Sequence, residues 1–118
     1  MLTFEEAQIA LDEIACDLPQ AIFVGLNGGY VLTENTVIDD DGFYILGQYH
    51  VQPRGLGRYV TVHYGSIATL YSGLTPHAFR EKLKYVLHHE LTHHIESLAG
   101  DRSLEVKDEI YRARHLRR

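Results

Sequence analysis

The chain has a single cysteine, Cys16, and it lacks any long apolar segment. One cysteine cannot form an internal disulfide, and such usage is typical of proteins in a reducing cytoplasm. No stretch approaches the roughly 18 apolar residues that a membrane-spanning helix needs. The first seven residues, Met-Leu-Thr-Phe-Glu-Glu-Ala, contain no basic segment followed by an apolar one, so no secretory signal is expected. We therefore expect a cytoplasmic protein without membrane contact.

Basic residues are scarce over most of the chain. Residues 1–111 contain 7 basic and 16 acidic residues, a net charge of −9, whereas the whole chain carries −5. Binding to a phosphate backbone needs a basic stripe, so no nucleic-acid partner is expected. The remaining four basic residues lie in a tail at 112–118, which we interpret as a solvated terminus. Contact of this tail with an acidic partner is the alternative.

The length and composition are those of one globular domain. The 118 residues are 45% apolar and 23% charged, without internal repeats or linkers, and this is enough to bury a core without disulfides. We expect one domain over 1–118, with the basic tail at its C-terminal end.

Three helices are predicted from their start and stop signals. Thr3-Phe4-Glu5-Glu6 is a capping box, and the apolar spacing behind it predicts a helix over about 4–17, before Pro19. Thr75-Pro76 begins a long helix-compatible stretch that ends at Gly100. Ser103 is interpreted as the cap of a last helix over about 104–114.

Short segments rich in β-branched and aromatic residues predict strands. They lie at 21–26, 30–33, 43–46 and 58–64, and the Pro/Gly segment 52–57 is expected to be a loop. The acidic run at 39–41 lacks the ligand spacing of a calcium loop and is interpreted as a turn. These elements predict an α+β fold, with a short mixed or antiparallel sheet packed against the helix 76–100 and with helices at both ends of the chain.

The long helix contains the sequence His89-Glu90-Leu91-Thr92-His93, which fits the pattern H-E-x-x-H. Residues four apart lie on one helical face, so the two imidazoles can bind one zinc ion at about 2.0–2.1 Å. Chance matches in a chain of this composition are expected roughly 0.04 times. The alternative is a pair of solvated histidines on a helix surface.

A catalytic zinc site usually has three protein ligands and a water molecule, whose pKa falls from 15.7 toward roughly 7. Glu90 follows a ligand directly, so it could take a proton from that water and pass it to a leaving amine. The motif therefore predicts hydrolysis of peptide bonds, with a peptide or protein as substrate.

The segments Gly57-Arg58-Tyr59, Val60 to Ser66 and His89 to His94 resemble small bacterial zincin-like metallopeptidases. The resemblance implies a minimal zincin-like fold, with a short sheet packed against the motif helix. It also implies zinc ligands at His89 and His93 and a general base at Glu90.

The third ligand is less well defined, because the chain departs from the commoner family pattern. Many relatives have glycine three residues after the second histidine and aspartate three residues later, whereas this chain has Glu96 and then Ala99. If an antiparallel helix follows Gly100, residues seven or eight positions into it lie level with His93. This favours Asp108 and Glu105. The alternatives left open are Glu109, Asp101 and Glu96.

Other histidines and tyrosines are interpreted as ordinary structural residues. His88 and His94 are rotated about 100° from the motif face, so they are expected to lie near the metal or in solvent. His63 lies on a strand that resembles the substrate-facing edge strand of zincins, where a peptide could pair. His50, His77, Tyr59 and Tyr64 have no assigned role.

Two other functions are alternatives to a peptidase. The first is a non-catalytic zincin-like binding or regulatory module, with a structural metal or none. The second, a metal-dependent nuclease, is disfavoured by the acidic chain and by the absence of the three-histidine motif of small bacterial endoribonucleases. The sequence does not define the oligomeric state.

Overall fold

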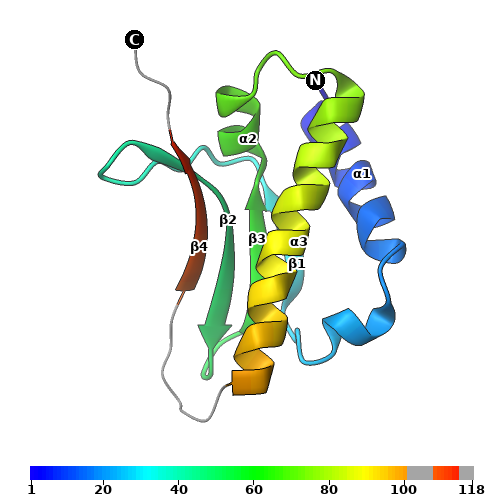
Figure 1. Ribbon diagram of the computed structural model, residues 1–118, viewed down its shortest axis with the longest axis vertical. Coiled ribbons are helices and arrows are strands. Elements are labelled where there is room, and N and C mark those ends of the chain that lie inside the picture. Colours follow the sequence, from blue (N-terminus) through cyan, green and yellow to red (C-terminus); the bar gives the residue numbers. More distant parts are fainter. Residues whose placement is uncertain (101–107, 115–118) are drawn as a thin grey trace.

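The computed structural model describes residues 1–100 and the strand at 108–114 (Figure 1). The elements along the chain are α1 Phe4–Cys16, the 3₁₀ helix η1 Gln20–Phe23, β1 Gly29–Thr33, β2 Phe43–Gln52, β3 Gly57–His63, α2 Tyr64–Leu70, α3 Pro76–Gly100 and β4 Asp108–Arg114.

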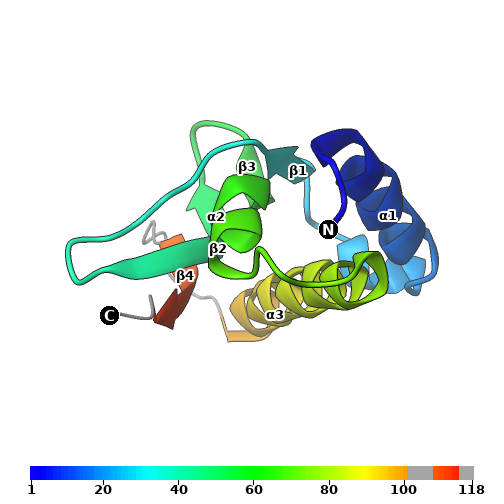
Figure 2. The same cartoon turned by 90° about the horizontal axis from the view of Figure 1, so that it is seen from above.

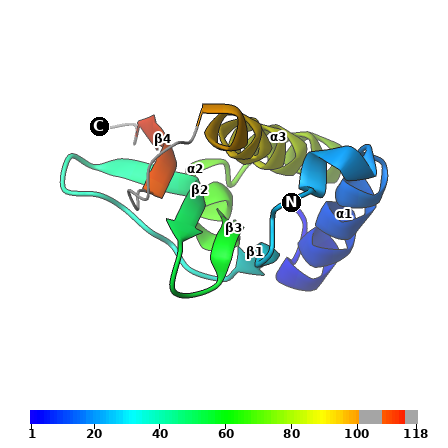
Figure 3. The same ribbon diagram turned by 90° about the horizontal axis from the view of Figure 1, so that it is seen from below.

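The four strands form one mixed sheet in the order β1-β3-β2-β4. β1 runs parallel to β3, while β2 is antiparallel to both β3 and β4. Figures 2 and 3 show α3 along one face of this sheet, with α1 beside it near β1 and with β4 at the far edge. The expected α+β fold, with a mixed sheet packed against the motif helix, is therefore confirmed.

The predicted caps of the two main helices are confirmed. At the start of α1, the Glu6 backbone N–H donates to Thr3 Oγ1 at 3.1 Å, and the Thr3 N–H donates to Glu6 Oε1 at 2.8 Å. At the start of α3, the Ala78 N–H donates to Thr75 Oγ1 at 3.1 Å. Both helices then run as the apolar spacing predicts, to Cys16 and to Gly100.

A glycine in β2 allows α3 to lie close to the sheet. A Cβ atom at Gly47 would come within 2.7 Å of Val86 Cγ1 and within 3.2 Å of Glu90 Oε2, both on α3. Any side chain here would push the helix outward, because protein interiors are close-packed. The absence of a side chain at Gly47 therefore lets Val86 and Glu90 of α3 pack directly against β2.

The acidic turn at 39–41 is confirmed, and it has a basic partner. Asp39 Oδ1 accepts from the backbone N–H groups of Asp41 and Phe43 at 2.9 and 3.0 Å. Arg112, from β4, donates to Asp39 Oδ2 at 2.6 Å, and its guanidinium lies over the Phe43 ring. The first residue of the predicted basic tail is thus part of the sheet.

Three sequence predictions about the elements are wrong. Segment 21–26 is not a strand, because η1 covers Gln20–Phe23 and Gly25 takes a positive φ of 83°. The last helix predicted over about 104–114 is replaced by strand β4, which pairs with β2 over 108–114. The predicted cap Ser103 lies outside the described residues.

The third error concerns the position of β3. This strand was predicted to be an edge strand, but it lies between β1 and β2, so both of its edges are occupied. It cannot add a peptide strand. None of the helices within residues 1–100 and 108–114 combines the length and the apolarity that a membrane crossing requires.

Candidate metal centre

The two motif histidines point at each other. His89 Nε2 and His93 Nε2 are 3.2 Å apart, and the two rings are nearly perpendicular, with their centroids 4.8 Å apart. Two nitrogens on a tetrahedral zinc ion at about 2.0–2.1 Å are about 3.3–3.4 Å from each other. The rings therefore fit a shared zinc ion, although two imidazoles that share one proton reach a similar distance.

The pair lies on the side of α3 that faces away from α1. Arg80, nine residues before His89, donates to Glu13 of α1 at 3.3 Å. Nine residues correspond to half a revolution of the helix, so His89 is on the opposite side from this contact. Figure 1 shows β4 on that side of α3, and α3 contacts β4 directly. The candidate centre thus lies on the side of α3 opposite α1, the side on which β4 also lies.

The electrostatic environment favours neutral imidazole at His89. Partial burial lowers the pKa of His89, and the neighbouring His93 lowers it further, while Glu96 acts in the opposite direction. Neutral imidazole is the form that binds zinc through a free nitrogen lone pair. Both side chains are only partly buried, so the pair is accessible to a metal ion.

Glu90 lies deeper than the two histidines. Its side chain is 0% exposed and packs between α3 and β2, where Gly47 leaves room for the carboxylate. A carboxylate in this position is held by packing on both sides, one residue along the helix from His89. The structure brings His89, Glu90 and His93 together on adjoining faces of one helix.

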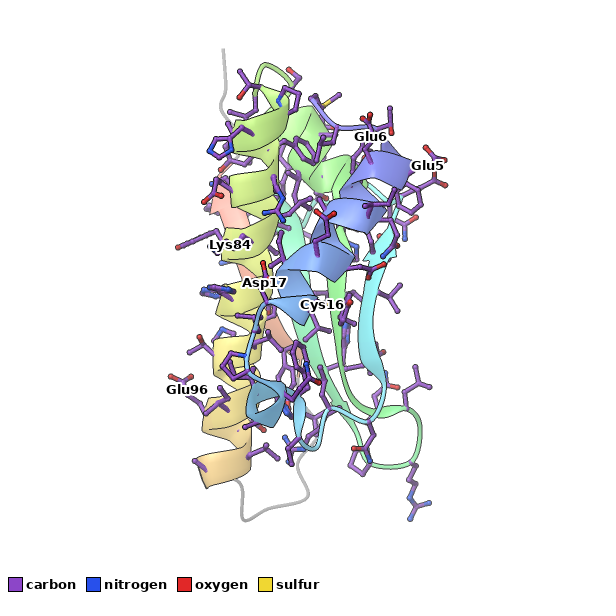
Figure 4. The ribbon with its side chains drawn as sticks, turned by 90° about the vertical axis from the view of Figure 1, so that its right-hand side faces the viewer. Glu5, Glu6, Cys16, Asp17, Lys84 and Glu96 are labelled. Atoms are coloured by element: carbon purple, nitrogen blue, oxygen red, sulfur yellow. The ribbon has the colours of Figure 1, made fainter. Side chains whose placement is uncertain are left out.

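The Glu96 side chain does not lean back toward the Nε2 atoms of His89 and His93. Its Oε1 is 3.7 Å from His93 Nδ1, the ring nitrogen on the far side from Nε2, and its side chain is 69% exposed. Figure 4 shows Glu96 on the side of α3 away from the strands. The carboxylate is therefore placed to orient the His93 ring electrostatically rather than to share a metal with it.

No group of three histidine, cysteine or acidic residues that could hold a metal is found in the part of the chain that the structure describes. The helical geometry that favoured Asp108 and Glu105 as the third ligand is wrong, because 108–114 is a strand. Glu105 and Asp101 lie outside the described residues. Asp108 and Glu109 both belong to β4, at neighbouring positions of its ladder with β2.

The register of β4 with β2 gives Asp108 and Glu109 different partners. Asp108 pairs with His50, and Glu109 pairs with Tyr49. Tyr49 contacts α3 through His94, whereas His50, the next residue, belongs to the other face of the sheet. Directly opposed residues of an antiparallel ladder share a face. In the ladder, the backbone of Glu109 is therefore opposite a residue that contacts α3.

A buried hydrogen-bond chain fixes the second half of the motif helix. His94 is 0% exposed; its Nε2 donates to the Val24 carbonyl at 2.8 Å, and its Nδ1 accepts from the Tyr49 hydroxyl at 2.8 Å. Arg58 donates to the Tyr49 hydroxyl at 2.9 Å and also to the Ser97 hydroxyl. Burial lowers the pKa of His94, while its bond to Val24 raises it and Arg58 lowers it. His94 thus ties α3 to β2 and to the loop after η1.

The sequence predicted His94 to lie near the metal or in solvent, and it gave Tyr49 and Arg58 no role. No local pattern links these residues, because they are 45 and 36 positions from His94 along the chain. His88 has a buried Nε2 with no hydrogen-bond partner among the described residues. It is rotated about 100° from His89, so it lies outside the candidate centre.

The remaining histidines and tyrosines have structural positions. His63 Nδ1 bonds to Thr33 Oγ1 and its Nε2 bonds to Gln48 Oε1, both at 2.8 Å. His50 Nε2 bonds to Thr61 Oγ1 at 3.0 Å, and the His50 ring stacks on Tyr59. The Tyr64 hydroxyl donates to the Leu2 carbonyl, and His77 is exposed.

These elements define an α+β protein whose longest helix carries a two-histidine candidate metal centre. No family model matches the chain, and no curated protein matches it either. Among solved structures, the chain is similar to a conserved hypothetical protein from Thermo thermophilus, with 25% sequence identity and a TM-score of 0.72. The match covers 83% of this chain and 98% of the other. It supports the fold and gives no activity.

Proposed function

We propose that the protein is a zinc-dependent metallopeptidase of the zincin-like class. The observation that carries the proposal is the 3.2 Å separation of His89 Nε2 and His93 Nε2, with Glu90 one residue from the first ligand. Two imidazoles spaced for a tetrahedral ion, together with an adjacent carboxylate, are the part of a zinc peptidase site that one helix can supply. The substrate class is a peptide or a protein.

Each motif residue has a separate role in this proposal. His89 and His93 would hold the zinc ion, which when bound polarises a carbonyl oxygen and lowers the pKa of water. Glu90 takes a proton from the attacking water and delivers it to the leaving amine nitrogen. Its burial between α3 and β2 excludes bulk water from the carboxylate and fixes its direction. The hydrogen bonds of His94 to Tyr49 and Val24 position the helix without contacting the substrate.

We propose Glu109 as the third ligand. It belongs to the strand on the metal side of α3, and its ladder partner Tyr49 reaches α3 through His94. His93 is the residue before His94 on that helix, so the Glu109 position and His93 lie at similar heights along α3. Three protein ligands leave one coordination position open, as catalysis requires.

The test of the assigned base is Glu90→Gln, measured as zinc content and as cleavage of a denatured protein substrate. The variant should keep its zinc and lose about 10²- to 10⁴-fold in cleavage rate, because the amide cannot accept the proton. The matched control is Glu81→Gln, the same change at an exposed position of α3, which should leave both measurements unchanged. Normal zinc content with undiminished cleavage in Glu90→Gln would refute the role of Glu90.

A non-catalytic module is the second candidate, favoured by one observation: Glu90 is completely buried and packs like a core residue against Gly47. In this case zinc stabilises the fold and no peptide is cleaved. Parent protein that binds zinc, gains thermal stability from it and cleaves no peptide would support the module. Zinc-dependent cleavage abolished by chelation would exclude it.

A further inference from the structure

We propose that Lys82 forms a carboxylate-binding subsite for the peptide substrate, next to the metal centre. The inference deepens the proposed function and rests on it. The carboxylate is either the C-terminal carboxylate of the substrate or the side chain of an acidic residue.

The first observation is a row of neighbouring rings that leads from the His89–His93 pair toward Lys82. His89 lies between His93 and Tyr85, with ring centroids 4.8 Å from the former and 6.4 Å from the latter. Lys82 Nζ is 5.4 Å from the centroid of the Tyr85 ring and 4.5 Å from that of Tyr71, the C-cap residue of α2. Tyr71, next to α2, and Tyr85, on α3, thus hold the ammonium group about two helical turns from the His89–His93 pair.

The helical geometry places Lys82 on the same face as the two ligands. Lys82 is seven residues before His89, which is a rotation of about 20° and a distance of about 10.5 Å along the axis. An extended peptide advances about 3.3 Å per residue, so this distance corresponds to about three residues. A carboxylate two or three residues from the scissile bond can therefore reach Lys82.

The charge environment leaves the ammonium group open to an anion. No carboxylate lies within 4.0 Å of Lys82 among residues 1–100, although the chain as a whole is acidic. The faces of two tyrosine rings attract the ammonium without accepting all three of its N–H bonds. Stacking thus holds the cation in place, and a carboxylate is the acceptor that complements it.

Lys84 provides a matched comparison on the same helix. It is two residues, or about 200°, from Lys82, and Figure 4 shows it projecting from the outer side of α3. Its side chain is exposed and contacts no ring among the described residues. The two lysines therefore have equal charge and different surroundings.

The experiment measures peptide binding, so it does not depend on cleavage. Acetylated tetra-alanine is used as the free acid, as the neutral amide, and as an amide with one alanine replaced by glutamate. Binding to the zinc-supplied full chain is followed through the ring resonances of Tyr71 and Tyr85, in the Glu90→Gln background so that the probes stay intact. The two carboxylate probes separate the C-terminal source from the side-chain source.

We expect at least one carboxylate probe to bind about 3- to 5-fold more tightly than the neutral amide, with a preference that weakens at high salt. Lys82→Met should remove the preference, Lys82→Arg should retain it and Lys84→Met should leave it unchanged. Equal binding of all three probes, no binding at all, or a preference that survives Lys82→Met would overturn the subsite. A carboxylate preference in the Glu90→Gln background, together with a parent protein that cleaves no peptide when zinc is supplied, would instead refute the peptidase and leave the subsite standing.

Discussion

Two pairs of histidines lie on opposite faces of the sheet, and their ring nitrogens meet different partners. On α3, His89 and His93 turn their Nε2 atoms toward each other at 3.2 Å. On the other face, His63 bonds to Thr33 and Gln48 through its two nitrogens, and His50 bonds to Thr61. The first pair converges on one point, whereas the second is distributed among neutral hydroxyl and amide groups.

The comparison separates a histidine pair that suits the proposed metal site from histidines that make structural hydrogen bonds. A ligand nitrogen must keep a lone pair directed at the metal, while a structural histidine uses both nitrogens in hydrogen bonds. His94 belongs to the structural kind although it is adjacent to His93, because Tyr49 and Val24 occupy its two nitrogens. The position of a histidine in the sequence therefore does not show whether it suits a metal site. The partners of its two ring nitrogens do.

The largest expected difference between the pairs is in zinc binding. His93→Ala should weaken zinc binding more than about 100-fold, because it removes one of two converging nitrogens. His63→Ala should bind zinc as the parent does, but should lower the free energy of unfolding by about 2 kcal/mol, since Thr33 and Gln48 lose a buried partner. Zinc titration and urea unfolding measure the two effects. Loss of zinc in His63→Ala at an intact fold would reverse the assignment of the pairs.

A smaller effect is expected from Glu109, the proposed third ligand on β4. Glu109→Gln should weaken zinc binding by about 10- to 100-fold, because an amide is a poor ligand for zinc. The matched change Asp108→Asn, at the ladder position opposite His50, should leave zinc affinity unchanged. Calorimetric titration with zinc measures both. The opposite result, with Asp108→Asn impaired, would return the third ligand to Asp108.

The predictable parts of the fold are those defined by local signals. The capping box at Thr3 and the helix-start signal Thr75-Pro76 locate the first residues of α1 and α3. Pro19 and Gly100 predict their last residues to within one position. The motif pair was predictable because an i, i+4 spacing fixes it within one turn of helix. Lys82 and Tyr85 were accessible to the same reasoning, since they share the helical face of His89, but Tyr71 was not.

The parts that were not predictable depend on contacts between distant segments. Segment 108–114 is short and its sequence suits either a helix or a strand, so pairing with the open edge of β2 decides the outcome. The choice of proposed third ligand depends on this pairing, which is why a helical interpretation led to Asp108 and Glu105. The Tyr49 and Arg58 bonds that hold His94 likewise join residues far apart in the sequence.

The smallest expected effect is the pH dependence of stability contributed by His63. Burial lowers the pKa of His63 in the folded protein, and the nearby His50 lowers it further. The unfolded chain has the ordinary pKa of about 6.5, so it binds more protons than the folded protein below that pH. The free energy of unfolding should therefore fall as the pH decreases from about 6.5 toward the folded pKa, where the change ends.

Urea unfolding between pH 7.5 and 5, with a chelator present to keep zinc out, measures this contribution. His63→Gln should flatten the decline, because glutamine does not titrate, while the declines due to His89 and His94, whose pKa values burial also lowers, should remain. His77→Gln, at an exposed position, should keep the full decline of the parent. A decline equally steep in His63→Gln would mean that the histidines on α3 carry the pH sensitivity. The two pairs would then differ in zinc binding, but His63 would contribute nothing to the pH dependence of the free energy of unfolding.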